Sequence, residues 1–414
     1  MAVRIALFLL LMALFVINSC APKKSADDRT DADLHAHAKE LADRFIILDG
    51  HIDLPDLLKE KKYRVGIDSP DTLISTGKGE FDYTRAKQGG LDAPFMSIYI
   101  PIEYQAKPDN GKALADSLID TVVGITKALP DKFALANTPA DIEANTAAGK
   151  ISLPMGMENG APIGNDLANL KYFFDRGIRY ITLAHNKDNQ ICDASMDGTG
   201  TWKGLSPYGR QVVTEMNRLG IIVDISHVDD NTFFQVMEHS KAPAIASHSS
   251  CRKFSPKARR DMTDEMIKKL GEKDGVMLIN FYTAFLDSAT MNNQSELNSI
   301  LKQQNLEESD SLAKPIIAEF KKNHPNPTTI EKVADHIDNV VKIAGIDHVG
   351  IGSDFDGVSG NLPVGLEDVS KYPDLIYTLL KRGYSDEDIE KICYKNAFRV
   401  WNKVIEVSKE MQSQ

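Results

Sequence analysis

Eight short hydrophobic runs recur along the chain, and most of them are continuous rather than alternating with polar residues. Continuous apolar runs of this length are typical of strands that are buried on both faces, as in parallel sheets. The pattern therefore predicts eight buried strands, at residues 45–54, 94–102, 151–160, 178–186, 220–228, 242–250, 275–282 and 348–357.

Amphipathic segments with helical spacing lie between several of these strands. Residues 166–177, 207–220 and 329–345 each end in a glycine, which is a common helix C-cap, and residues 229–243 have the same spacing. Alternation of strands with helices predicts an α/β fold, a (β/α)8 TIM barrel. A doubly wound open sheet is the alternative, but it would normally carry a glycine-rich phosphate-binding turn after its first strand, and none is present.

Two long polar segments depart from a minimal barrel. Residues 56–92 follow the first predicted strand, and residues 284–328 follow the seventh. Because both come after strands, we expect them to form long loops over the C-terminal face of the barrel and to shape its mouth. The barrel domain itself is expected to span residues 37–414.

The N-terminus has the pattern of an export signal. Residues 1–20 carry Arg4, then an apolar run that is about as long as a signal-peptide core and short for a membrane-spanning helix. The run ends in INSC, which resembles the lipobox of bacterial lipoproteins. That resemblance implies that residues 1–19 are removed and that Cys20 is lipidated, so that residues 20–36 tether the protein to a membrane of the bacterial cell envelope. A plain secretory signal or an uncleaved anchor are the alternatives.

Composition excludes some functions. The chain has 48 basic and 59 acidic residues, a net charge of −11, so nucleic acid is not an expected partner. Apart from Cys20, the cysteines Cys192, Cys251 and Cys393 are isolated in the sequence. This spacing argues against both a disulfide scaffold and a cysteine-based zinc site.

Histidines and carboxylates gather at the C-terminal ends of the predicted strands. His51 and Asp53 end the first strand, and because residues i and i+2 of a strand face the same side, they point together. The corresponding ends of the third, fourth, fifth, sixth and eighth strands carry Glu158, His185, His227, His248 and Asp354. Each of these alone would be an ordinary polar residue, but the C-terminal strand ends of a barrel meet at one face. Asp224, earlier in the fifth strand, is expected to pack within it or to support a ligand.

Four histidines and three carboxylates at one face of a barrel predict a metal centre. Imidazoles and carboxylates without thiolates suit Zn²⁺, with Mn, Fe or Co as alternatives. The number of ligands indicates two ions, and one glutamate can bridge such a pair. Two ions can lower the pKa of a bridging water to about 7 and hold the hydroxide as a nucleophile.

Several stretches together identify a family. They are DGHIDLP, GMENG, RYITLAHN, DISHV, ASHSS, ARRDMTDE, LINFY and GIGSDFDGV. With these stretches in this order, from about residue 45 to 400, the chain resembles the membrane (renal-type) dipeptidases, zinc peptidases of the amidohydrolase-like barrel class. The resemblance implies a di-zinc enzyme that cleaves dipeptides, including those with a C-terminal D-residue, by attack of a metal-bridging hydroxide. The family is often dimeric, so a homodimer is expected.

The resemblance also implies a set of metal ligands. Carried over position by position, it assigns one zinc ion to His51 and Asp53. It assigns the second ion to His227 and His248. Glu158 would bridge both ions.

Four further residues receive roles in substrate binding and proton transfer from the same resemblance. His185 would polarise the scissile carbonyl, and Arg260 would bind the terminal carboxylate of the substrate, with Arg259 as the alternative for that role. Asp354 would accept the proton of the nucleophile and pass it to the leaving amine. Tyr282 would line the substrate pocket.

Two other functions remain as alternatives. The first is a metal-dependent amidohydrolase that acts on N-acyl amino acids or cyclic amides. Many such relatives bridge their metals with a carboxylated lysine on the fourth strand, and no lysine precedes His185 there. The second is a peptide-binding lipoprotein without activity, which predicts lost ligands, whereas every matched position is filled.

Overall fold

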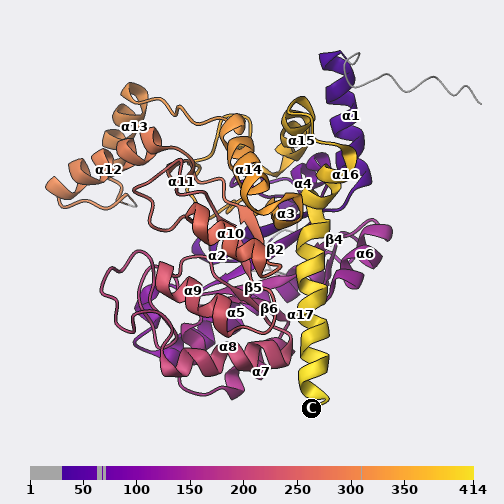
Figure 1. The fold of residues 1–414 in the computed structure, drawn as a ribbon. Helices are drawn as coiled ribbons and strands as arrows, with labels where there is room; N and C mark the ends of the chain where they lie inside the picture. Colours follow the sequence, from indigo (N-terminus) through magenta and orange to yellow (C-terminus); the bar gives the residue numbers. More distant parts are fainter. Residues whose placement is uncertain (1–29, 63–67, 69–70, 309) are drawn as a thin grey trace, which may run out of the picture.

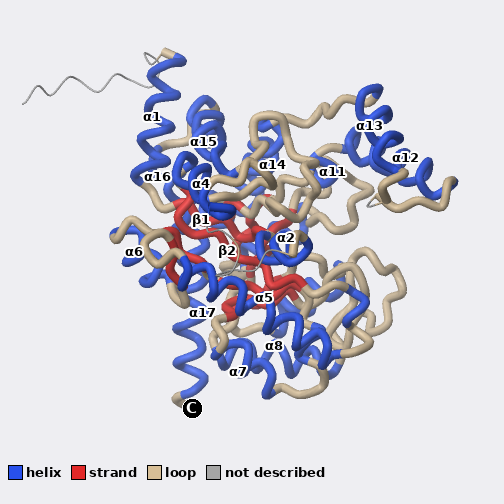
Figure 2. The backbone as a smooth tube through the Cα atoms, turned by 180° about the vertical axis from the view of Figure 1, so that it is seen from behind, coloured by secondary structure: helices blue, strands red, loops and turns tan. Residues whose placement is uncertain are grey.

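Eight parallel strands close into a barrel in the order β1–β10–β9–β8–β7–β6–β5–β2. The strands lie at the centre of the molecule, with helices around them (Figures 1 and 2). This computed structural model describes residues 30–62, 68, 71–308 and 310–414. The barrel strands are β1 Ile47–Ile52, β2 Leu91–Tyr99, β5 Met155–Glu158, β6 Ile178–Thr182, β7 Ile222–Asp224, β8 Ile245–Ser249, β9 Val276–Ile279 and β10 Val349–Ile351. The prediction of a (β/α)8 barrel is confirmed, and the alternative of an open sheet is wrong.

Helices surround the barrel and connect its strands (Figure 2). The α-helices are α1 Asp31–Arg44, α2 Leu54–Glu60, α3 Asp71–Ile74, α4 Tyr83–Gly89, α5 Pro108–Ala128, α6 Pro139–Ala147, α7 Ala168–Asp175, α8 Pro207–Leu219, α9 Asp230–His239, α10 Asp264–Glu272, α11 Thr283–Leu286, α12 Ser288–Gln303, α13 Ala313–Asn323, α14 Ile330–Ala344, α15 Tyr372–Lys381, α16 Asp386–Glu390 and α17 Asn396–Gln412. Short 3₁₀ or π segments are η2 Ile102–Tyr104, η3 Ala161–Ile163, η4 Ile346–His348, η5 Val369–Lys371 and η6 Lys391–Lys395.

The third predicted strand, residues 151–160, is two strands rather than one. Its first part, β4 (Ile151–Leu153), pairs with β3 (Phe133–Leu135) in a separate two-stranded sheet, and only β5 belongs to the barrel. Pro154 stands between the two parts. Proline has no N–H to donate to a ladder, and although its carbonyl accepts from the backbone N–H of Met96 in β2, the strand changes partner at this point.

The two segments that were expected to be long loops contain helices. Residues 56–92 include most of α2 and all of α3 and α4, and residues 284–328 include most of α11 and all of α12 and α13. The helices α12 and α13 project from the barrel (Figure 1) and share a small core of their own, made of Leu297, Leu301, Ala313 and Phe320. They follow β9 and face the residues after β10, so the expected placement at the C-terminal side of the strands is confirmed.

The predicted tether is wrong for residues 31–36, because these residues belong to α1. Thr30 and Asp33 form a capping box, in which each side chain accepts a hydrogen bond from the backbone N–H of the other, and this pairing starts the helix. The predicted signal peptide, residues 1–19, and Cys20 lie outside the described residues. Within the described part of the chain, no helix has the length and apolar character needed to cross a membrane.

The floor of the barrel is aromatic. Trp401 of α17 is buried and its ring lies 5.2 Å from that of Phe95, which in turn lies 5.1 Å from the ring of Tyr180. Packing of large side chains fixes their rotamers, because interiors have few voids into which they could turn. The hydroxyl of Tyr180 is thereby held directly beneath the polar residues at the mouth.

Candidate metal centre

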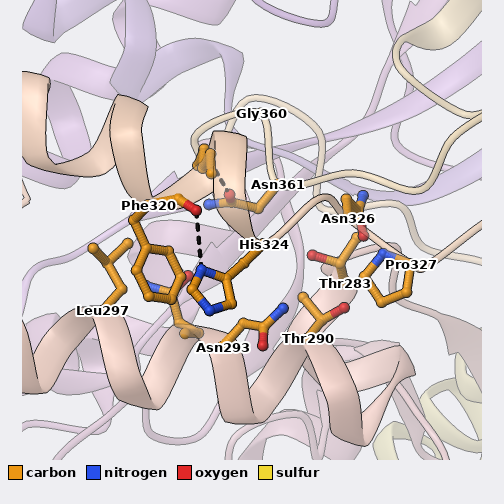
Figure 3. Close-up of a pocket in the computed structure, with 12 residues that line it drawn as sticks. Thr283, Thr290, Asn293, Leu297, Phe320, His324, Asn326, Pro327, Gly360 and Asn361 are labelled. Atoms are coloured by element: carbon orange, nitrogen blue, oxygen red, sulfur yellow. Dashed lines mark hydrogen bonds between the residues drawn. The ribbon is translucent and has the colours of Figure 1, made fainter.

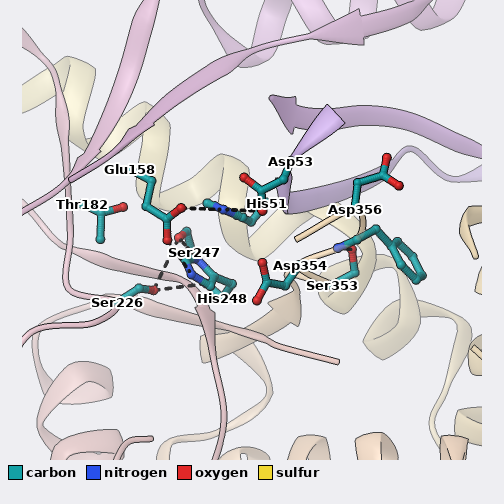
Figure 4. A network of polar contacts seen from close by, with 12 residues as sticks. His51, Asp53, Glu158, Thr182, Ser226, Ser247, His248, Ser353, Asp354 and Asp356 are labelled. Carbon is teal, nitrogen blue, oxygen red and sulfur yellow. Dashed lines mark hydrogen bonds and ion pairs between the residues drawn. The ribbon is translucent and has the colours of Figure 1, made fainter. Parts of the chain in front are cut away.

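Glu158 lies at the centre of the polar side chains that meet at the mouth of the barrel (Figure 4). Its Oε1 atom is 3.0 Å from Nε2 of His227 and 3.4 Å from Nε2 of His248. It is 3.7 Å from Nε2 of His185. The other oxygen, Oε2, is 3.5 Å from Nε2 of His51. The two oxygens of one carboxylate therefore face different histidines, which is the arrangement that a bridging ligand requires.

His51 and Asp53 form the first half of the centre. The Nε2 atom of His51 is 3.4 Å from Oδ2 of Asp53, and these two residues form a group of potential ligands with Glu158. His51 Nε2 and Asp53 Oδ1 are buried and have no hydrogen-bond partner among the described residues. Buried polar atoms without a partner are costly. A metal ion would satisfy them, so the residues present fit a metal.

His227 and His248 form the second half. Their Nε2 atoms are 2.9 Å apart and both face Oε1 of Glu158. His227 also lies close enough to His185 and Glu158 for the three to share one metal ion, and His248 lies equally close to His51 and Asp354. The structure thus brings every residue of the predicted ligand set together, and the division of roles between ligands and neighbours stays a prediction.

A tyrosine fixes the tautomer of His51. The hydroxyl of Tyr180 donates to the carbonyl of Gly50 at 3.1 Å, so at 2.8 Å it accepts from the Nδ1–H of His51. Although burial lowers the pKa of His51, the nearby Tyr180, Asp53 and Glu158 raise it well above its usual range, so without a metal this ring is charged. A bound metal would replace the proton on Nε2, whose lone pair points toward Asp53 and Glu158. This is the form of histidine that binds a metal, and such supporting hydrogen bonds orient metal ligands.

A serine and an aspartate do the same for His248. The hydroxyl of Ser247 donates to Asp224 at 2.6 Å and accepts from the Nδ1–H of His248 at 2.7 Å. Asp224 also accepts from the hydroxyl of Thr182 and from the backbone N–H of Ser247. Asp224 therefore supports a predicted ligand, whereas Tyr180 and Ser247 were missed because a hydroxyl inside a strand gives no sequence signal of its own.

His185 lies beside the centre in a position to act on a substrate. Burial lowers its pKa, so it is neutral at physiological pH. Its ring is edge-on to that of Tyr99, with 5.0 Å between the centroids, and both residues border the same cavity. A neutral imidazole here can donate one hydrogen bond to a carbonyl oxygen.

Asp354 faces the centre from the end of β10. Burial raises its pKa to about 7, the charge of His51 opposes this rise, and the charges of Asp53 and Glu158 add to it. Asn280 donates a hydrogen bond to its carboxylate at 2.8 Å. A carboxylate with a pKa near neutrality is suited to accept and release a proton.

The backbone is tightly constrained at this mouth. His227 and Asp354 both have a φ of +67°, a left-handed conformation that costs free energy for residues other than glycine and that often occurs at functional sites. A Cβ atom on Gly357 would lie 2.2 Å from Oδ2 of Asp53 and 2.8 Å from Oδ1 of Asp354. Only glycine allows the turn after β10 to approach the centre so closely.

Arg260 is turned inward, whereas Arg259 is exposed, so of the two only Arg260 approaches the centre. Its guanidinium donates to the hydroxyl of Ser249 and to the carbonyl of His248, and lies 5.6 Å from the ring centroid of Phe285. Tyr282 packs edge-on against the same phenylalanine at 4.8 Å. Neither Arg260 nor Tyr282 is among the residues that border the cavity at the mouth, and their contact with a substrate stays a prediction.

The cavity at the mouth has a volume of about 350 Å³ and an acidic lining. The carboxylates that border it are Asp53, Asp56, Glu60, Glu158, Asp354 and Asp356. Sequence reasoning missed Asp56, Glu60 and Tyr99, and placed Asp356 in a turn. The spacing of Asp53, Asp56 and Glu60 is helical, and it would have indicated one shared face if a helix had been expected directly after the first strand.

A second cavity, of about 240 Å³, lies between α12, α13 and the turn that contains Gly360 and Asn361 (Figure 3). Amide side chains, Lys321, His324 and Phe320 line it. It contains no cluster of carboxylates and histidines, and we therefore assign the chemistry to the mouth of the barrel.

Comparison with known proteins agrees with this assignment. Residues 35–414 match the family model of the membrane dipeptidases, peptidase family M19. An uncharacterized dipeptidase of Schizosaccharomyces pombe is 35% identical over 372 residues, which cover 86% of this chain and 80% of that protein. The crystal structure of the probable dipeptidase PvdM from Pseudomonas aeruginosa aligns with a TM-score of 0.79 at 27% identity, over 91% of this chain and 99% of that one.

A further solved structure carries a bound ligand. It is a metallo peptidase from Rhodobacter sphaeroides liganded with a phosphinate mimic of the dipeptide L-Ala-D-Ala, and it aligns with a TM-score of 0.70 at 25% identity, over 87% of this chain and 99% of that one. The strand β6, on which many amidohydrolases carry a bridging lysine, reads IRYIT here. The chain therefore belongs to the membrane dipeptidase family, peptidase family M19, and is a metal-dependent dipeptidase.

Proposed function

We propose that this protein is a di-zinc dipeptidase that cleaves dipeptides with a free C-terminal carboxylate, including those that end in a D-residue. The observation that carries the proposal is the position of Glu158, whose two oxygens face His51 on one side and His227 with His248 on the other. This donor set of imidazoles and carboxylates suits zinc. The mimic of L-Ala-D-Ala bound to the Rhodobacter sphaeroides protein supports the D-residue.

The two metal sites share one ligand. His51 and Asp53 would hold one ion, His227 and His248 the other, and Glu158 both. Two divalent ions there would supply a water molecule of lowered pKa, which is a nucleophile at neutral pH. The hydrogen bonds from His51 to Tyr180, and from His248 to Ser247, keep the metal-binding nitrogens turned inward.

The remaining side chains act on the substrate. His185 donates a hydrogen bond to the oxygen of the scissile carbonyl, on which negative charge develops. Asp354 accepts a proton from the attacking water at its carboxylate and releases it to the leaving amine. Arg260 binds the terminal carboxylate, because a guanidinium presents parallel N–H groups that match the two oxygens of a carboxylate.

A panel of dipeptides tests this function. We expect the purified protein to cleave L-L and L-D dipeptides, to lose this activity with a chelator, and to regain it when Zn²⁺ is added back. N-acetylated amino acids serve as the matched control substrates, because they keep the scissile amide and the terminal carboxylate but lack the free amine. Dipeptide cleavage that persists in the presence of the chelator would overturn the metal mechanism. Cleavage of the N-acetyl compounds alone would favour an amidohydrolase.

We also propose a lipid anchor at Cys20, which would place the protein on a membrane of a bacterial cell envelope, and a homodimeric assembly. The lipobox-like INSC supports the anchor. The cysteines Cys192, Cys251 and Cys393 are buried, so they are not available for lipidation. Cys20→Ala is expected to move the protein from the membrane to the soluble fraction of bacterial cells, whereas Ser25→Ala is expected to leave it in the membrane. Retention of the Cys20→Ala variant in the membrane would rule out the anchor.

A further inference from the structure

Three carboxylates of the cavity at the mouth have no role in the chemistry proposed above. They are Asp56, Glu60 and Asp356, and they border the same cavity as Glu158 and His185. Metal binding and proton transfer use only Asp53, Glu158 and Asp354. Burial raises the pKa of Asp56 to about 6, so this acid is still ionised at neutral pH, and the complement of its charge should be sought on the substrate.

Two of these carboxylates belong to one face of α2. Asp53 is the N-cap of this helix, and Asp56 and Glu60 follow it by three and seven residues, a spacing that places side chains on one face. Leu57 shares this face and also borders the cavity. With a rise of 1.5 Å per residue, Glu60 stands about 10 Å along the helix from Asp53. The carboxylates therefore form a stripe that leads away from the metal centre.

The third carboxylate has an unsatisfied oxygen. The Oδ1 atom of Asp356 accepts from the backbone N–H of Glu80 at 2.6 Å, but Oδ2 is buried and has no hydrogen-bond partner among the described residues. A φ of +65° directs the side chain from the turn after β10, and Figure 4 shows it beyond Asp53 as seen from Glu158. Burial and the adjacent carboxylate of Glu80 raise the pKa of Asp356 well above its usual range, so this carboxyl offers a hydrogen bond rather than a full charge. A buried carboxyl oxygen that borders a cavity needs a hydrogen-bond partner, and a substrate can supply one.

The cation that faces this stripe in the described structure is weakly held. The Nζ atom of Lys59 is 3.9 Å from Oδ1 of Asp56, and the side chain of Lys59 is 41% exposed. Ion pairs this exposed contribute little free energy because water screens them and the side chains are mobile. A cation of the substrate can therefore replace Lys59 at small cost.

The direction of the stripe tells which part of a dipeptide meets it. Arg260, which would bind the C-terminal carboxylate, contacts residues of β8. Helix α2 instead follows β1. On the shorter way around the barrel, β10 and β9 lie between β1 and β8, so Arg260 and α2 are on different sides of the mouth. The N-terminal residue therefore points toward α2. Its α-ammonium is attached next to the scissile carbonyl and stays near the metal centre. A group that reaches Asp56 and Glu60 must stand at the end of a long side chain.

We propose that this cavity selects dipeptides whose N-terminal residue carries a long basic side chain, lysine or arginine, with its charge held by Asp56 and Glu60 and with Asp356 as a hydrogen-bonding partner. The inference rests on the proposed function, because it assumes that the scissile carbonyl lies at the metal centre and the C-terminal carboxylate at Arg260. It adds the substrate class and three specificity-determining residues. Arginine would pair with a carboxylate through two N–H groups, and lysine through a single charge.

The test compares side chains that differ only in charge. We expect kcat/KM for Lys-Ala and Arg-Ala to exceed that for norleucyl-Ala about tenfold, because norleucine keeps the stem of lysine without the ammonium. Nε-acetyl-lysyl-Ala should behave like norleucyl-Ala. The preference should fall as the salt concentration rises, since the stripe lies at the open end of the cavity.

Variants of the stripe make the test specific. In Asp56→Asn the ratio of kcat/KM for Lys-Ala to that for norleucyl-Ala should fall about tenfold. Glu60→Gln, at an exposed position that tolerates change, should lower the same ratio even if Asp56→Asn folds poorly. Glu410→Gln removes the same charge from α17 at the opposite end of the barrel and should leave the ratio unchanged.

Three outcomes separate the inference from the function on which it rests. Equal kcat/KM for Lys-Ala and norleucyl-Ala in the unaltered protein would overturn the basic-side-chain proposal and leave the dipeptidase function standing. The same holds if Glu60→Gln and Asp56→Asn both keep the original ratio. Failure to cleave any of these dipeptides in the presence of Zn²⁺ would instead count against the proposed function.

Discussion

Replacement of Asp354 by asparagine is expected to lower kcat about 10³-fold while both metal ions stay bound. Asparagine has nearly the same shape and can keep the contact with Asn280, but its amide cannot accept and return a proton at neutral pH. General acid–base catalysis by one positioned group commonly contributes 10²- to 10⁴-fold. Stopped assays on a dipeptide give kcat, and elemental analysis gives the metal content of the same sample.

The pH dependence of kcat/KM tests whether Asp354 acts in its ionised form. Asp354 must be ionised to accept a proton, so kcat/KM should fall as the pH drops through the pKa of this group. Burial places that pKa near 7 without metal ions, and two nearby divalent ions would lower it. In Asp354→Asn this acid limb should disappear together with most of the rate.

A control variant separates proton transfer from a general loss of charge. Asp347→Asn removes an aspartate from η4, which lies just before β10 at the other end of the barrel, and should retain full activity. Normal turnover by Asp354→Asn would show that another group transfers the proton. Loss of metal from this variant would instead assign Asp354 to the ligands, as its proximity to His51 and His248 allows.

The barrel and its centre could be predicted from the sequence because two rules act together. Strands buried on both faces appear as continuous apolar runs, and the polar residues that interrupt such runs at their ends must face the mouth. His51 and Asp53 illustrate this, since both face Glu158 while Ile52 between them is buried in the core, although Asp53 follows the last residue of β1 as the N-cap of α2. The family motifs then supplied roles that spacing could not.

Other features could not be predicted from local pattern. The run of residues 151–160 looks continuous, yet it is divided at Pro154 between two sheets, and the partner of each part is set by tertiary structure. The polar residues 31–36 look like a tether, yet a capping box and the burial of Ala38 and Leu41 make them the start of a helix. Tyr180 and Ser247 act through hydrogen bonds to histidines from other strands, and such partners are set by tertiary structure rather than by sequence spacing.

The acidic stripe shows a further limit of the sequence reading. Asp56 and Glu60 lie in a segment that was expected to be a polar loop, where charged residues carry no information about direction. In the structure the segment is helical directly after Asp53, so the same residues point into the cavity. The short helix α2 therefore places both acids at the border of the cavity.

Replacement of Glu158 by glutamine is expected to have the largest effect, a loss of at least about 10⁴-fold in kcat/KM together with a fall from two bound ions to one or fewer. The carboxylate presents Oε1 to His227 and His248 and Oε2 to His51. In glutamine one of these oxygens becomes an NH₂ group, which has no lone pair to offer a metal. The glutamine side chain can therefore act as a ligand to one ion at most.

Metal titration followed by a dipeptide assay in excess Zn²⁺ distinguishes the two parts of this expectation. Glu103→Gln is the matched control, since it removes an exposed carboxylate of η2 after β2 without altering the centre, and it should bind two ions and retain its rate. Two tightly bound ions in Glu158→Gln would show that Glu158 is not the bridge. One bound ion with an undiminished rate would show that a single metal suffices, and the second group of histidines would then act on the substrate rather than on a metal.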